Sequence, residues 1–153
     1  MMITRTGVLH SLAPEQRRRL MELGREVSIP AGTRIFEEGR RADRFWLVHT
    51  GSVALDLHVP GRRSPVVETL GSGDLLGWSW LFPPRRWHFG AETVSRVHAY
   101  EFDVAAVLEL CEREPALGRD LAVAVAAVVG ERLTTARTRL LDLYGPYGSG
   151  PRP

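Results

Sequence analysis

The sequence predicts a mainly β domain, an antiparallel barrel or jelly roll, with helices on both sides of it. Between residues 25 and 102 apolar and polar residues alternate with a period of two, and turn residues interrupt the pattern at short intervals. A helical pattern over Leu9–Gly24 precedes this segment, with Ser11 and Pro14 near its start. Apolar residues recur at helical spacing after it, as far as Leu143. A chain of 153 residues is long enough for one domain with a substantial core.

The predicted strands are short and are separated by glycine, proline or charged turns. We expect them at residues 25–29, 33–36, 45–49, 52–59, 66–70, 87–94 and 96–102. In the segment 52–59 the apolar residues fall on one face, which we expect to be buried: Val53, Leu55, Leu57 and Val59. Many short strands at this spacing are typical of closed β architectures.

Two helices are expected after the strands. Asp103 is a suitable N-cap for a helix over residues 104–113, and Pro115 opens a longer one that ends near Leu143. The segment Ala122–Val129 is apolar almost all round, which predicts burial on more than one side. One side can cover the strands, and the other is expected to pair with a second copy of the chain. The tail, residues 144–153, is rich in glycine and proline and is expected to be disordered.

Composition favours a soluble, cytoplasmic protein. No apolar stretch is long enough to span a membrane, and the single cysteine, Cys111, fits a reducing compartment. The net charge is only +2, so charge alone does not indicate a nucleic-acid surface. The five histidines never form a His-x-His pair, which argues against a cupin-like metal enzyme.

The stretch from Gly71 to Val94 is the candidate functional segment. It contains a Gly-x-Gly-Asp turn, a short apolar run over residues 77–82, and then Arg85 and Arg86. The first turn of a helix leaves N–H groups unpaired and favours negative charge, and a glycine lets a ligand approach the backbone. These features together predict an anion pocket. The alternative is an ordinary strand-turn-strand corner whose tryptophans fill the core.

These residues resemble the cyclic nucleotide-binding domain of the catabolite activator (Crp/Fnr-like) family, over residues 9–143. The resemblance rests on Ile35–Gly39, Ala42–Val48, Thr50–Val53, Gly71–Gly77 and Ala91–Thr93. It implies a jelly roll (a double-stranded β-helix) over about residues 25–102 and C-terminal helices over about residues 104–143, the longer of which forms a homodimer. It also implies a regulatory, ligand-binding role in signalling rather than an enzymatic one.

In that family a short helix after the Gly-Asp turn begins Gly-Glu, and its glutamate holds the ribose hydroxyl. Here Gly77 matches the glycine, but Trp78 stands at the glutamate position. An indole only donates a hydrogen bond, so it cannot accept one from ribose. The resemblance therefore implies a divergent pocket that binds cAMP or cGMP weakly, or that binds another small anion.

An arginine of the family holds the cyclic phosphate, and this sequence offers Arg85 and Arg86. The family spacing, counted back from Ala91, lands on Arg85. Strand parity agrees, because it groups Arg85, Trp87, Phe89 and Ala91 on a face expected to point inward. Arg86 would share the solvated face with His88, Gly90 and Glu92. In the alternative reading both arginines lie on the surface.

Other residues are candidates for the same site. Ser79 could offer its hydroxyl to the anion, or simply end a strand. The three tryptophans Trp78, Trp80 and Trp87 could box a planar base, or could fill the core and plug the pocket. From the long helix Arg132, Thr134 and Thr135 could contact a ligand, or form a solvated face.

Family members that regulate transcription carry a helix-turn-helix after the long helix. Only about ten residues follow that helix here, so we do not expect this chain to bind operator DNA by itself. The leading hypothesis is a sensor or adaptor that signals to a separate protein partner. One alternative is a dimeric scaffold that binds no ligand and docks on another protein, and the other is a cupin-like metal enzyme.

Overall fold

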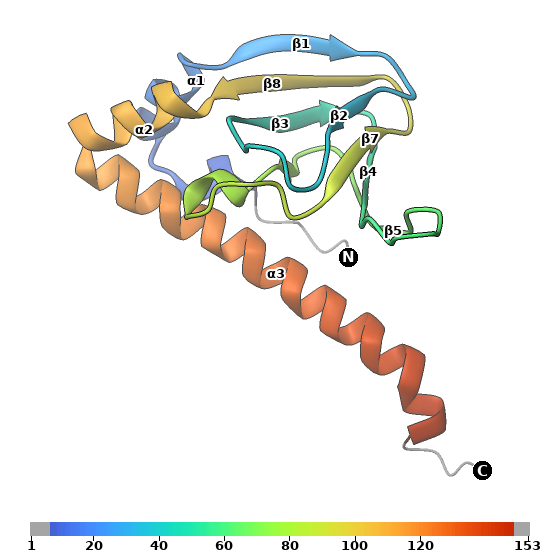
Figure 1. Cartoon of the computed structure of the whole chain (residues 1–153). Coiled ribbons are helices and arrows are strands. Elements are labelled where there is room, and N and C mark those ends of the chain that lie inside the picture. Colours follow the sequence, from blue (N-terminus) through green and yellow to red (C-terminus); the bar gives the residue numbers. More distant parts are fainter. Residues whose placement is uncertain (1–6, 149–153) are drawn as a thin grey trace.

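Two antiparallel sheets of four strands each form a roll, and helices cover one side of it (Figure 1). The structure, a computed structural model, describes the backbone of residues 7–148 and the side chains of residues 7–142. The described helices are η1 (Val8–Ser11), α1 (Pro14–Met21), η2 (Ser79–Leu81), α2 (Val104–Arg113) and α3 (Pro115–Gly148). The strands are β1 (Arg25–Ile29), β2 (Arg34–Phe36), β3 (Arg44–Thr50), β4 (Val53–Asp56), β5 (Val66–Leu70), β6 (Leu75–Leu76), β7 (Gly90–Thr93) and β8 (Val97–Asp103).

The strand order is β1-β8-β3-β6 in one sheet and β2-β7-β4-β5 in the other. All pairs of neighbouring strands are antiparallel. The predicted mainly β jelly roll with a long C-terminal helix is confirmed. The expected alternation is also visible in β4, where Val53 and Leu55 are buried and Ala54 between them is only half-buried.

Several element boundaries differ from the prediction. The N-terminal helix is split into η1 and α1, because Pro14 has no N–H to continue a helix through it and instead starts a new one. The strand expected to reach residue 59 leaves its ladder after Asp56, where the register with β5 shifts. The strand expected to begin at Trp87 begins at Gly90, because Trp87 is hydrogen-bonded to residues 39 and 40 instead.

The helical part follows the sequence pattern closely. Asp103 caps α2, and its carboxylate accepts a hydrogen bond of 3.1 Å from the backbone N–H of Ala106. In α3 the residues that pack on the rest of the chain are Leu117, Leu121, Ala124, Val125 and Val128. Beyond these residues α3 continues past the end of the core (Figure 1), and Arg132 and Arg139 still donate to the carbonyl oxygens of Leu75 and Val67.

α3 continues to Gly148, five residues past the expected end at Leu143. The first half of the segment that we expected to be disordered is therefore helical, and residues 149–153 lie outside the described part of the chain. None of the helices in the described part is long and apolar enough to cross a membrane.

Candidate functional site

The turn at Gly77 joins β6 to η2 in a backbone conformation that favours glycine, with a φ of 96°. η2 is a single turn of three residues, Ser79–Leu81, with 3₁₀ geometry. Such a short turn aligns too few peptide dipoles to attract an anion strongly. The expected anion site at a helix start therefore has no α-helix to support it.

Trp80 is a core residue. Its side chain is fully buried, and its indole N–H donates to the Gly77 carbonyl oxygen over 3.1 Å. Its ring stacks on Phe45 with centroids 4.7 Å apart, and Phe45 stacks in turn on Phe102 at 4.8 Å. These contacts favour the interpretation of Trp80 as packing and leave its ring no face for a ligand.

Trp87 joins the two sheets. Its ring stacks on Phe36 of β2, with centroids 3.9 Å apart, and Phe36 stacks on Trp46 of β3 at 5.8 Å. Because β2 and β3 belong to different sheets, these rings occupy space between the sheets. A Cβ atom on Gly77 would come within 2.8 Å of the Trp87 ring, so the indole lies directly against the turn.

Trp78 and Ser79 are both engaged with His88. The Trp78 ring stacks on the imidazole with centroids 4.7 Å apart, and the Ser79 hydroxyl lies 2.8 Å from His88 Nδ1. Sequence reasoning missed His88, which it placed only on a solvated strand face. No sequence signal marks this pair, since it depends on how the loop between the two residues folds. Within the described residues no carboxylate orients His88, so the pair lacks the third member of a nucleophilic triad.

Arg85 does not point inward from a strand, so the parity prediction is wrong there. Its φ of 58° breaks the extended conformation on which alternation depends, and its side chain is exposed. Arg86 is exposed as well, and its guanidinium donates to the Gly39 carbonyl oxygen over 3.0 Å. From Trp87 onward the parity holds only in part: Trp87 and Ala91 are buried and His88 and Glu92 are exposed as expected, but Gly90, which was expected on the solvated face, is buried. The alternative reading, with both arginines on the surface, describes the structure.

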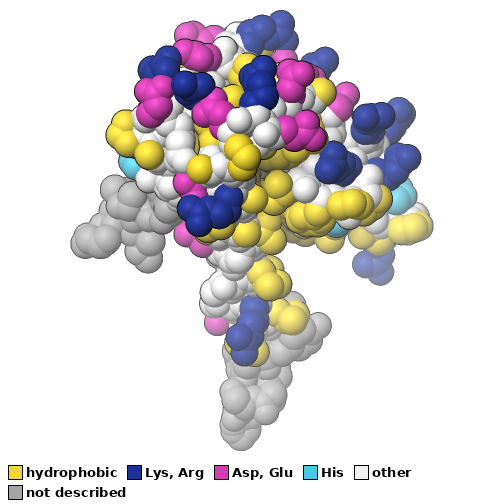
Figure 2. Space-filling view, turned by 90° about the vertical axis from the view of Figure 1, so that its left-hand side faces the viewer, with side chains coloured by type: hydrophobic (Ala, Val, Ile, Leu, Met, Phe, Trp, Pro, Cys, Tyr) yellow, Lys and Arg dark blue, Asp and Glu magenta, His cyan; other side chains and the backbone are white. Residues whose placement is uncertain are grey.

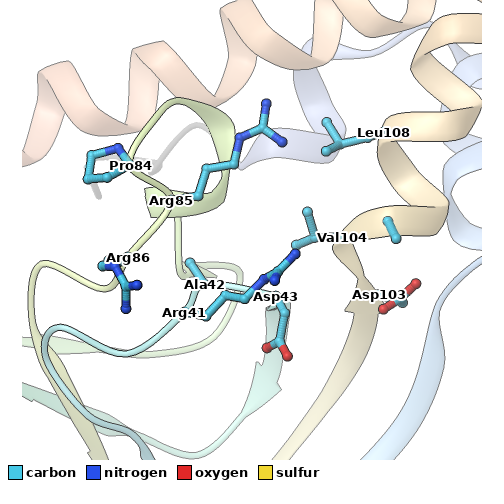
Figure 3. Close-up of a pocket in the computed structure, with 10 residues that line it drawn as sticks. Arg41, Ala42, Asp43, Pro84, Arg85, Arg86, Asp103, Val104 and Leu108 are labelled. Atoms are coloured by element: carbon cyan, nitrogen blue, oxygen red, sulfur yellow. The ribbon is translucent and has the colours of Figure 1, made fainter.

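The two arginines line a groove of about 580 Å³ outside the roll (Figure 3). One wall comes from two loop segments, and the other comes from the end of β8 and the start of α2. The lining residues are Arg41, Ala42, Asp43, Pro84, Arg85 and Arg86 on the first wall, and Asp103, Val104, Ala105 and Leu108 on the second.

The three candidates on α3 have different surroundings. Arg132 is half-buried and donates to the carbonyl oxygen of Leu75, two residues before Gly77. Thr134 is exposed, and its hydroxyl donates to the Gly130 carbonyl oxygen of its own helix over 3.0 Å. Thr135 is also exposed. Only Arg132 therefore lies beside the candidate turn.

An ion-pair network lies on the outer face of the second sheet. Arg34 donates to both carboxylate oxygens of Asp56, over 2.6 and 2.9 Å, and also pairs with Glu37 and Glu92. The hydrogen bonds that Arg34 donates to Asp56 and Glu37 raise the pKa of Arg34, and the same bond from Arg34 lowers the pKa of Glu37. The arginine neutralises these carboxylates, and the described residues contain no group of three or more metal-ligating side chains suited to an ion.

The family model for the cyclic nucleotide-binding domain matches residues 26–114, more than half of the chain. The chain belongs to the cyclic nucleotide-binding domain family. The matched segment covers both sheets, the Gly77 turn and α2.

A curated relative has a similar sequence over most of this chain. A "CRP-like cAMP-activated global transcriptional regulator" of Mycobacterium tuberculosis is 25% identical over 141 residues, which are 92% of this chain. This chain spans 61% of the length of that regulator.

Solved structures of the same kind are similar as well. A cyclic nucleotide-binding protein of Geobacter metallireducens superposes with a TM-score of 0.73 at 30% identity, over 82% of this chain and 91% of that one. The catabolite activator protein of Thermus thermophilus superposes with a TM-score of 0.72 at 27% identity, over 90% of this chain and 62% of that one.

Proposed function

We propose that this chain is a dimeric regulatory module that admits no cyclic nucleotide between its sheets and acts by binding a protein partner. The observation that carries the proposal is the position of Trp87. Its ring lies against Gly77 and stacks on Phe36, in the space where a bound ligand would meet the turn. A nucleotide could enter only by displacing a buried aromatic side chain, which costs several kcal/mol of packing.

The charge around the turn supports the same proposal. A cyclic nucleotide is an anion, and burying its phosphate without a nearby cation and hydrogen bonds is unfavourable. Arg85 and Arg86 both lie on the outer groove rather than between the sheets. Trp78 offers no acceptor for a ribose hydroxyl, and its ring is already stacked on His88.

An exposed apolar stripe on α3 supports pairing with a second copy. Val123 is 63% exposed and Leu133 is 69% exposed; Leu140 follows Leu133 one heptad later, and the neighbouring Leu141 is exposed as well. Small residues, such as the exposed Gly130, lie between them and allow close approach of another helix. Figure 2 shows hydrophobic side chains along the projecting helix. The family resemblance also implies a dimer through this helix.

The test is a thermal-shift titration of the purified protein with cAMP and cGMP up to millimolar concentration. A ligand present at a hundredfold excess over its Kd stabilises the native state by about 2.7 kcal/mol, which shifts the Tm by several degrees. We expect no shift with either nucleotide. A saturable rise in Tm would contradict the proposal. The regulatory role proposed here involves no catalysis.

The second candidate function is a weak receptor for cAMP, cGMP or another small anion, and the position of Arg132 favours it. This guanidinium reaches β6 from α3, close to the Gly77 turn. If a nucleotide raises the Tm, Arg132→Gln should remove the rise, whereas Arg137→Gln on the exposed part of the same helix should not.

A further inference from the structure

The groove beside α2 presents two arginine side chains, Arg41 and Arg85, that have no partner within the described part of the chain. Among the described residues, neither the Arg41 nor the Arg85 guanidinium forms a hydrogen bond or an ion pair, whereas Arg86 donates to Gly39. In Figure 3 the Arg41 and Arg85 side chains extend toward α2, and Arg86 lies apart from them. Free guanidinium groups in a groove favour a ligand with carboxylate or phosphate groups.

The wall that carries these arginines is held by backbone hydrogen bonds. Arg85 N–H donates to the Phe82 carbonyl oxygen over 3.0 Å, and its own carbonyl accepts from Ala42 N–H over 2.8 Å. Arg41 and Arg86 form an additional bridge between the two segments. A non-glycine residue at positive φ costs roughly 1 kcal/mol or more, so these contacts hold Arg85 where it would not otherwise stay. These backbone contacts therefore fix the main chain of Arg85 beside the groove.

The opposite wall is aliphatic, and carboxylate acceptors from both walls lie at one side of the groove. Val104, Ala105 and Leu108 of α2 face the groove. The carboxylates of Asp43 and Asp103 lie on the other side of the groove from the Arg85 guanidinium (Figure 3). They are suited to accept hydrogen bonds from donors, and they would repel a compact anion that filled the groove.

We propose that this groove binds an acidic segment of a partner protein. Acidic side chains of the segment pair with Arg41 and Arg85, an aliphatic side chain packs on Val104 and Leu108, and backbone N–H groups face Asp43 and Asp103. The lining residues include no aromatic ring on which a nucleotide base could stack. A peptide thus matches the cations, the acceptors and the aliphatic wall together. This inference rests on the proposed function, because it names the chemistry of the partner.

The experiment measures binding of fluorescein-labelled short peptides, rich in Asp and Glu with a Leu or Val among them, by fluorescence anisotropy at low salt. The same peptides with Asn and Gln in place of the acids are the first control. We expect acidic peptides to bind and neutral ones to bind at least ~10-fold more weakly. Added salt should weaken the binding, because the pairs are exposed to solvent.

Three variants locate the binding. The double variant Arg41→Glu/Arg85→Glu should lower the affinity at least ~10-fold, whereas Arg62→Glu/Arg63→Glu, the same charge change on an exposed loop, should change it less than ~2-fold. Ala105→Glu adds a negative charge to the opposite wall, where the first turn of α2 tolerates an acid, and should also weaken binding. Circular dichroism confirms that each variant is folded.

Three results would overturn the inference. Acidic peptides that bind no better than neutral ones would exclude this ligand class, and equal losses in both double variants would show unspecific attraction to arginine. Inorganic pyrophosphate that binds tightly with the same dependence on Arg41 and Arg85 would assign the groove to a small phosphate ligand. None of these results affects the thermal-shift test with cAMP and cGMP, so a failure of this inference can be distinguished from a failure of the proposed function.

Discussion

The indole of Trp87 and the ring of Phe36 stack almost parallel, 12° apart in orientation and 3.9 Å between centroids. The pair connects β2 of one sheet to the loop that follows the Gly77 turn, and Trp46 of the other sheet packs against it. The conformation of the candidate site therefore depends on aromatic packing between the two sheets.

Removing the Trp87 ring should be costly. Trp87→Ala leaves a cavity between the sheets, and we expect the free energy of unfolding to fall by about 3–5 kcal/mol. Urea denaturation followed by circular dichroism measures this change. Trp78→Ala is the matched control. Because Trp78 is only half-buried, this variant should lose markedly less free energy of unfolding. Equal losses in the two variants would show that the Trp87 stack has no special role.

A methyl group at Gly77 should destabilise the protein for two separable reasons. Gly77→Ala places a side chain at a positive φ and brings its Cβ to 2.8 Å from the Trp87 ring. Gly61→Ala has a similar backbone conformation, with φ of 75°, but meets nothing within 4 Å. The backbone cost alone is roughly 1 kcal/mol, so the free energy of unfolding of Gly61→Ala should fall by about that much and that of Gly77→Ala by clearly more. Chemical denaturation measures both changes. Similar losses would mean that the indole moves aside without cost.

The exposed stripe of α3 should control the oligomeric state. Leu133→Glu puts a charge where a second helix is expected to pack, and light scattering should report monomers that remain folded. As the control, Thr135→Glu adds the same charge at an exposed position of the same helix, about 200° around the helix axis from Leu133, and should leave the oligomeric state unchanged. Val125 is unsuitable for this test because it is buried within its own chain. A stable dimer of the Leu133 variant would place the interface elsewhere.

Stability should fall in acid partly through Glu101. Burial alone would raise the pKa of Glu101, but the hydrogen bonds from Arg25 and from the Trp46 indole and the charge of Arg44 outweigh it, so the pKa lies below its ordinary value of 4.5. A carboxyl whose pKa is lower in the folded state stabilises the protein above the unfolded-state pKa, and this contribution is lost as the pH falls through the folded-state value.

Urea unfolding of wild type and Glu101→Gln across about pH 7 to pH 3 measures this contribution. The difference in stability between the two proteins should be largest near neutral pH and should shrink below about pH 4.5. A difference that stays constant with pH would rule out titration of Glu101 as its source.

Local patterns were sufficient for much of this structure. The period of two over residues 25–102 predicted the roll, Asp103 predicted the start of α2, and helical spacing predicted α3. Each of these depends on residues near one another in the chain, where periodicity and capping chemistry decide the outcome.

The candidate site depended on contacts between distant segments. Parity placed Arg85 inward because it assumed an extended backbone, yet hydrogen bonds to Phe82 and Ala42 hold that residue in the left-handed region and keep its side chain outside. His88 contacts Ser79, and Phe36 stacks on Trp87, because the fold brings together segments that are separate in the sequence. The sequence alone therefore determined the fold family and the residues available for a site. Only the tertiary structure decided which of them face the interior, because burial at a loop is set by its packing partners and not by its own pattern.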